Sequence, residues 1–194
     1  MYSFREKTPE RRTDIANKSR YQDYKPELRQ DFNTRCGYCN DHESLRNSFY
    51  EIDHFIPKIL LNENEYADYK NLVFSCRFCN NSKSNKWPTD DRDKCNDGIA
   101  GFIDPCNEDY DSQFTRNSMG KIIPQSELGK WMYRELKLYL NRHSILWQIE
   151  KIENILKEFR ELGLHENDTY KRLFIRMSNY FFDSIQELKE DNVG

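Results

Sequence analysis

The sequence lacks any apolar run of about 18 residues, the length at which a membrane-spanning helix becomes a candidate. Only 37% of its 194 residues are hydrophobic, whereas 32% are charged. It also lacks the positively charged start and following apolar stretch of a secretory signal. We therefore expect no membrane segment and no secretion, and we predict a cytoplasmic protein.

The sequence also lacks a strong excess of either sign of charge, since the formal net charge is −3 and the pI is about 5.9. A free-standing nucleic-acid binder is usually basic, so this balance counts against one. The stretch from Arg5 to Arg29 is the exception, with eight basic residues against five acidic ones. Such a stretch binds phosphates or forms a solvated arm, and composition leaves both readings open.

The length fits one domain, or one small domain with an appendage. Aromatic residues make up 14% of the chain, which argues against disorder because aromatic side chains bury large areas. We expect an ordered connector in which Ile99, Phe102, Ile103 and Phe114 serve as anchors. The predicted parts are an N-terminal arm that is partly ordered at best (1–24), a compact core (25–88), the connector (89–125) and a C-terminal helical region (126–194).

Four of the six cysteines form two Cys-x-x-Cys pairs, Cys36/Cys39 and Cys76/Cys79. Without a secretion signal, metal binding explains them better than disulfides. Four thiolates bind Zn²⁺ tetrahedrally and leave no open position, so this zinc is expected to be structural. We expect Gly37 to permit the tight turn of the first pair.

The local patterns predict both strands and helices. A helix is expected from Lys25 to near Thr34, a strand over 49–53, a partner strand over 72–74, and a helix from the second Cys pair to Lys86. Further along, Ser126 is a predicted N-cap, apolar residues recur at helical spacing from Ile145 to Phe159, and Gly163 ends that helix. A second helix after Asp168 completes a C-terminal hairpin or small bundle.

Asp53 and His54 lie between the two Cys pairs and suit phosphodiester hydrolysis. This reaction needs a base to activate water, a cation to stabilise charge, and correct placement of both. His54 is suited to be the base because an imidazole titrates near neutrality, and the Asp53 carboxylate is a hard ligand for Mg²⁺ or Mn²⁺. Alone, the Asp-His pair is a weak signal, because a lone histidine is more often structural.

The combined order of motifs is more specific: Cys-x-x-Cys, Asp-His, Asn71-Leu72-Val73, then Cys-x-x-Cys-Asn-x-x-Lys. Over about residues 26–88 it resembles the HNH endonuclease family. The resemblance implies an α+β fold with a small ββα-metal core around one divalent cation. It further implies the following roles: His54 as general base, Asp53 and Asn80 as ligands of the catalytic cation, Asn71 as a brace that orients the base, Lys83 as a phosphate contact, and Cys36, Cys39, Cys76 and Cys79 as zinc ligands.

One position departs from the family pattern, because the final motif residue is often histidine and here it is Asn80. An amide oxygen is a harder ligand than imidazole, so we expect Mg²⁺ or Mn²⁺ to be preferred over Ni²⁺ or Zn²⁺. The neighbouring Asn81 is the alternative candidate for this role.

These patterns lead to two hypotheses of different classes. The first is a metal-dependent endonuclease that cuts nucleic acid, expected to be DNA. In size and layout the chain also looks like the small HNH subunits of bacterial anti-phage systems, which implies an ATPase partner subunit. The alternative is a non-catalytic zinc-knuckle module that binds nucleic acid or a protein partner.

Overall fold

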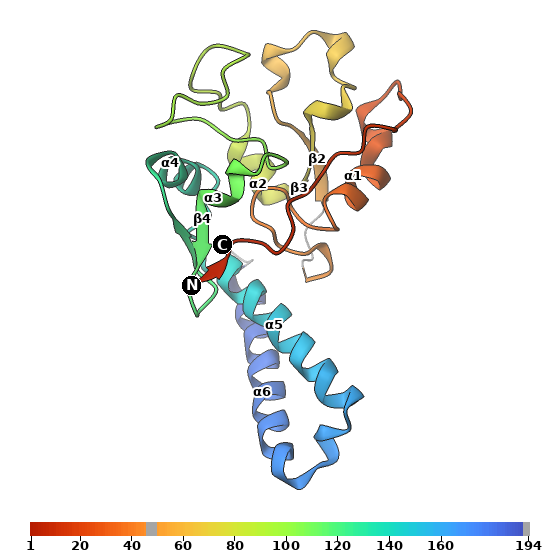
Figure 1. The fold of residues 1–194 in the computed structure, drawn as a ribbon, viewed down its shortest axis with the longest axis vertical. Coiled ribbons are helices and arrows are strands. Elements are labelled where there is room, and N and C mark those ends of the chain that lie inside the picture. Colours follow the sequence, from red (N-terminus) through yellow and green to blue (C-terminus); the bar gives the residue numbers. More distant parts are fainter. Residues whose placement is uncertain (46–49, 192–194) are drawn as a thin grey trace. The chain divides into compact units, whose positions relative to one another are not determined.

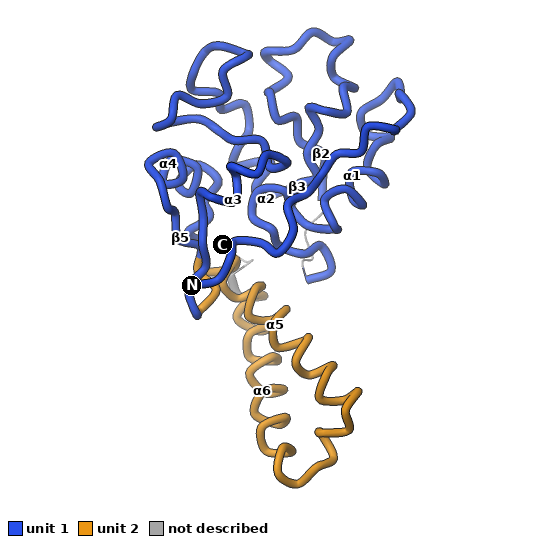
Figure 2. Tube along the Cα trace, in the orientation of Figure 1, with its two compact units in different colours: residues 1–118, 122–139 blue, residues 119–121, 140–194 orange. Residues whose placement is uncertain are grey.

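The computed structural model describes residues 1–45 and 50–191. They form two compact units, which are coloured separately in Figure 2 and are described here one at a time. The first unit contains residues 1–118 and 122–139, and the second contains residues 119–121 and 140–194.

The centre of the first unit is a two-stranded antiparallel sheet followed by a helix (Figure 1). Strand β2 (Tyr50–His54) pairs with β3 (Leu72–Cys76), so that Asp53 lies opposite Val73 and His54 opposite Leu72. Helix α2 (Arg77–Lys83) begins directly after β3. The predicted mixture of helix and sheet is therefore confirmed. The first residue of the predicted strand, Phe49, lies outside the described residues.

Apolar side chains of β3 hold this arrangement together, since Leu72, Val73 and Phe74 are completely buried. Helix α1 (Lys25–Asp31) contributes Leu28 to the same core. Strand residues that are buried on both faces read as a continuous apolar run rather than as an alternating one. The short run at 72–74 is thus a strand buried on both faces.

Both helices of this core end earlier than predicted, and backbone conformation explains why. After α1, Asn33 and Thr34 adopt φ values of 52° and 59°, which cannot continue a right-handed helix. After α2, Ser84 has φ 49° and its N–H bonds to the Asn80 carbonyl at 2.8 Å. A serine held at this φ is conformationally strained.

The N-terminal arm is ordered, contrary to our expectation. Strand β1 (Tyr2–Ser3) pairs with β4 (Phe114–Arg116), and Phe4 is buried. The Arg5 guanidinium donates to the Pro105 carbonyl at 2.7 Å, and that of Arg11 donates to the Leu72 carbonyl at 2.7 Å. Hydrogen bonds from arginine guanidinium groups to backbone carbonyls leave no hydrophobic periodicity in a sequence. The sequence pattern therefore did not indicate that this arm is ordered.

The basic residues of this stretch are largely used inside the first unit. Five of the eight form ion pairs, which favours a structural role over a phosphate-binding patch. The pairs are Arg5–Asp111, Arg11–Asp104, Arg12–Asp31, Lys18–Glu27 and Arg29–Glu43.

A second, three-stranded sheet has the order β1-β4-β5, where β5 is Ile122–Pro124. Helix α3 (Asp109–Ser112) precedes β4, and α4 (Glu127–Glu135) follows β5. The predicted N-cap is confirmed, since the Ser126 hydroxyl accepts the Gly129 N–H at 2.8 Å. Phe102 and Phe114 anchor the connector as expected, whereas Ile99 is 67% exposed and does not.

The second unit is a helical hairpin of α5 (Asn141–Glu161) and α6 (Asp168–Asp191). Gly163, at φ 65°, ends the first helix as predicted. The rings of Phe159 and Phe174 stack between the helices with centroids 6.3 Å apart. The predicted C-terminal hairpin is therefore confirmed, while the predicted domain limits at residues 24, 88 and 125 stay predictions. Every helix in the described parts of the chain is too short or too polar to cross a bilayer.

Gly37 is required for close packing and not for a special backbone angle, so our expectation about its role was wrong. Its φ lies outside the left-handed region, but a Cβ there would sit 2.7 Å from the Phe32 ring and 2.8 Å from a Val73 methyl. Both neighbours are buried and cannot easily move.

We predict that Gly37→Ala lowers the free energy of unfolding by about 1–3 kcal/mol, the usual cost of overpacking a core. Urea unfolding with zinc present measures the loss. Gly98→Ala is the control for backbone strain alone, because Gly98 has φ 89° and no atom within 4 Å of a Cβ. A Gly37→Ala protein as stable as the parent would contradict the packing argument.

Candidate active site

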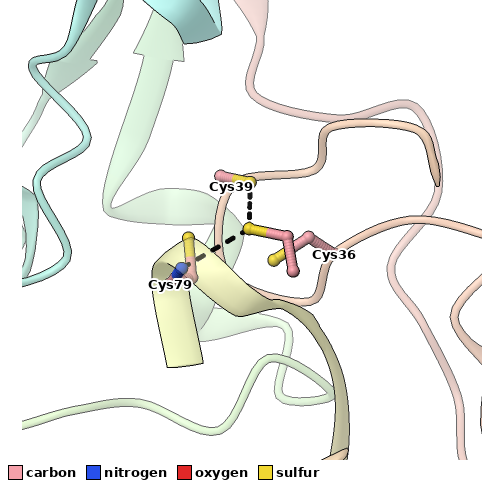
Figure 3. A group of neighbouring side chains, drawn as sticks. Cys36, Cys39 and Cys79 are labelled. Atoms are coloured by element: carbon pink, nitrogen blue, oxygen red, sulfur yellow. Dashed lines mark hydrogen bonds between the residues drawn. The ribbon is translucent and has the colours of Figure 1, made fainter. Parts of the chain in front are cut away.

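Four cysteine thiols converge where the two pairs meet. Their sulfur atoms all lie within 4.8 Å of one another, and all four residues are buried. Figure 3 shows Cys36 and Cys39 arriving from a loop and Cys79 from α2, with their side chains directed to one point. The Cys79 N–H bonds to the Cys76 sulfur at 3.4 Å, as expected where a knuckle leads into a helix.

This cluster fits zinc. Zn–S bonds of about 2.3 Å in a tetrahedron place sulfur atoms about 3.8 Å apart. The Cys39 and Cys76 sulfurs are 3.9 Å apart. Burial raises the pKa of the Cys39 thiol well above its usual value, and hydrogen bonds with the other three thiols raise it further. A bound cation offsets this penalty, because it binds thiolates and displaces their protons.

Asp53 lies at the end of β2 in a buried network. Its Oδ2 accepts the Tyr38 hydroxyl at 2.5 Å and lies 3.1 Å from the Lys83 ammonium. Burial raises the pKa of Asp53, while the Lys83 charge and the Tyr38 hydrogen bond act in the opposite direction. Both side-chain donors converge on Oδ2, so Oδ1 keeps lone pairs for a cation.

Lys83 is completely buried on the face of α2 that packs against β2. Besides its ion pair with Asp53, its ammonium donates to the His54 carbonyl at 2.9 Å. We expected a phosphate contact for this residue. Its buried placement favours a different role, in which Lys83 holds the two adjacent residues Asp53 and His54 in position.

Asn80 lies one turn before Lys83 and faces Glu51. Its amide Nδ2 donates to the Glu51 carboxylate at 2.8 Å. Because a carboxylate accepts hydrogen bonds, this contact sets the amide orientation and leaves the Asn80 Oδ1 as a possible ligand. Glu51 and Asp53 are alternate residues of β2 and therefore lie on the same face of the strand.

His54 is held through one ring nitrogen. Its Nε2 lies 2.8 Å from the Tyr66 carbonyl, which can only accept, so Nε2 carries the proton and Nδ1 keeps a free lone pair. The Tyr21 ring meets the imidazole edge-on at 4.7 Å. Burial lowers the pKa of His54, and the charges of Lys58 and Lys83 lower it further against the Tyr66 hydrogen bond. The imidazole is therefore kept neutral near pH 7.

Asn71 braces the chain that follows His54. Its side-chain Oδ1 accepts the Ile56 N–H at 2.8 Å and its Nδ2 donates to the Ile56 carbonyl at 3.1 Å. Its own carbonyl accepts the Phe55 N–H at 2.8 Å. These three bonds fix the backbone immediately after the histidine.

Residues 36–86 match the family model described as HNH endonuclease. This segment is similar to HNH endonuclease domains. The matched segment contains both cysteine pairs, β2, β3 and α2. Neither the curated proteins nor the solved structures compared with the chain gave a match. The HNH domain implies interaction with nucleic acid and suggests nuclease activity, and its cysteine cluster is compatible with structural zinc.

Two further residues of the site, Glu51 and Tyr38, had no role assigned from the sequence. Glu51 carried a signal, since it precedes Asp53 by two positions and so shares its strand face. Tyr38 lies inside the first knuckle, and no pattern indicated that its hydroxyl would bond Asp53. Burial raises the pKa of Tyr38 well above its usual value, so this hydroxyl stays a donor.

We predict that the purified protein holds one zinc ion and that Cys79→Ser lowers both the zinc content and the melting temperature. Elemental analysis and thermal unfolding are the two measurements. Cys106→Ser is the matched control, because Cys106 is a free thiol outside the four-cysteine cluster. Equal zinc contents in the parent and in Cys79→Ser would contradict the zinc assignment.

We predict that Lys83→Met lowers the free energy of unfolding by about 3–5 kcal/mol, because it leaves Asp53 buried without its partner. Lys86→Met is the control, since Lys86 forms an exposed ion pair with Glu135 that is expected to contribute about 1 kcal/mol or less. Denaturant unfolding of both variants measures the difference. Equal losses of unfolding free energy in the two variants would show that the Lys83–Asp53 pair stabilises the fold no more than the Lys86–Glu135 pair does.

Proposed function

We propose that this protein is a metal-dependent endonuclease that hydrolyses phosphodiester bonds in DNA. The observation that carries the proposal is the placement of His54, a buried imidazole whose Nε2 lies 2.8 Å from the Tyr66 carbonyl and whose Nδ1 has no hydrogen-bond partner among residues 1–45 and 50–191. This base adjoins Asp53 within the HNH endonuclease domain.

In the proposed reaction, the Nδ1 of His54 removes a proton from a water molecule, and the hydroxide attacks the scissile phosphorus. The Tyr66 carbonyl stabilises the imidazolium that forms, because it accepts the hydrogen bond of Nε2–H. The lowered pKa of His54 keeps the base form available near neutral pH. The proton then returns to solvent or to the leaving oxygen.

Asp53 and Asn80 are the proposed ligands of a catalytic cation, through Oδ1 of each side chain. A divalent cation bound there supplies positive charge that stabilises the phosphorane-like transition state and the leaving oxygen. Glu51 offers a second carboxylate beside Asn80 and steadies its amide. Since every one of these ligands is an oxygen, Mg²⁺ or Mn²⁺ is the expected cation.

The remaining residues position the reacting groups. Lys83 and Tyr38 hold the Asp53 carboxylate through Oδ2, and Lys83 also binds the His54 carbonyl. Asn71 fixes the backbone that follows. Groups held in this way need little rearrangement when the substrate binds, which is the usual basis of electrostatic catalysis.

DNA as the substrate, the cytoplasmic location, the anti-phage role and the ATPase partner stay predictions from the sequence. They rest on the motif resemblance and on the size and layout of the chain.

We predict that purified protein cuts plasmid DNA with Mg²⁺ or Mn²⁺ and that His54→Ala lowers the cleavage rate by about 10²–10⁴-fold, the usual contribution of a general base. Zinc content and melting temperature should stay close to those of the parent. His165→Ala is the control, because His165 lies in the helical hairpin.

Cleavage that is equally fast in His54→Ala would contradict the assigned base. Intact plasmid with the unsubstituted protein in either metal, together with measurable DNA binding, would favour the non-catalytic zinc-knuckle module. Faster cleavage with Ni²⁺ than with Mg²⁺ would contradict Asn80 as an oxygen ligand.

A further inference from the structure

A second group of residues, Tyr21, Lys58 and Tyr66, surrounds the candidate base. The Lys58 ammonium lies 4.1 Å from the centroid of the Tyr21 ring and 5.2 Å from that of Tyr66. The same two rings meet His54 edge-on, with centroids 4.7 Å and 6.1 Å from the imidazole. The two tyrosines therefore hold a cation next to the base.

The state of Lys58 differs from that of the other cations near the site. Within residues 1–45 and 50–191, its ammonium contacts the two aromatic faces and forms neither an ion pair nor a side-chain hydrogen bond. In contrast, Lys83 is paired with Asp53, and Arg77 lies 3.7 Å from Glu51. Lys58 is also partly exposed, whereas Lys83 is completely buried.

We propose that Lys58 binds a backbone phosphate of the nucleic acid, held in place by the faces of Tyr21 and Tyr66. This proposal rests on the proposed function, since it concerns the substrate of that site. Cation–π contacts attract an ammonium without satisfying its hydrogen-bond donors, so the N–H groups stay available to an anion. The backbone phosphate of a nucleic-acid substrate is the anion that would lie near both His54 and Lys58.

The positions of the three residues in the chain support a site formed by the fold. Tyr21 begins a short 3-10 helix (Tyr21–Tyr24) at the end of the N-terminal arm, and Lys58 begins another (Lys58–Leu60) just after β2. Tyr66 comes from the segment between β2 and β3, and its carbonyl also binds His54. The 3-10 helix before α1 and the connection between β2 and β3 thus meet beside the imidazole.

The test is DNA binding as a function of salt, by fluorescence anisotropy on a labelled duplex. The buffer contains neither Mg²⁺ nor Mn²⁺, so that no cleavage accompanies binding. Each phosphate contact contributes about 0.9 to the slope of log K against log salt. We expect Lys58→Met to weaken binding and to lower this slope by about 1, because it removes one contact.

Lys130→Met is the matched control, since Lys130 pairs with Glu127 on the exposed surface of α4 and should leave the slope unchanged. Tyr21→Phe keeps an aromatic face and should retain the parent slope, whereas Tyr21→Leu should weaken binding. Zinc content and melting temperature, measured for every variant, exclude misfolding as the cause.

Equal slopes and affinities for Lys58→Met and the parent would overturn the inference even if the protein cuts DNA. A parent protein that binds with the expected slope difference but does not cut would retain the Lys58 site and refute the proposed function. A parent protein that shows no measurable DNA binding would overturn the phosphate site as well.

Discussion

The convergence of four thiols is the contact on which the core around β2, β3 and α2 depends. It joins the loop after α1 to the start of α2, two segments that are 37 residues apart at Cys39 and Cys76. A closed metal site would add folding free energy to the buried apolar cluster in which the four cysteines lie. Asn80 directly follows Cys79, and the position of a proposed catalytic ligand is thereby tied to the position of a zinc ligand.

A second constraint acts on the end of β2. A buried ion pair such as Lys83–Asp53 often contributes little net stability, because removing both charges from water offsets their attraction. What the pair provides is a defined arrangement, since one ammonium binds a side chain and the carbonyl of the next residue. Together with the Asn71 bonds to Ile56, it restrains the backbone on both sides of His54.

The sequence predicted the parts of this architecture that rest on short spacing rules. The Cys pairs, the Asp-His pair, the apolar partner strand at 72–74 and the C-terminal hairpin all follow from local patterns. Local patterns did not predict the contacts between single side chains that are far apart in the sequence. No periodicity indicates that Tyr38 would bond Asp53, that Arg11 would reach the Leu72 carbonyl, or that a Cβ at Gly37 would meet Val73.

The pairing of the first strand has a consequence for synthesis of the chain. Tyr2 and Ser3 pair with β4, and the Arg116 side chain donates to the Phe4 carbonyl across 112 residues of sequence. On the ribosome, strand β1 therefore has no pairing strand until β4 has emerged. Until then the edge of β1 is unpaired and the apolar side chain of Phe4 is exposed to other chains. We therefore expect chaperones to bind, and early misassembly to begin, at this segment. Pairing of β1 with β4 is expected to form later than the local pairing of β4 with β5, because contacts between distant residues form slowly.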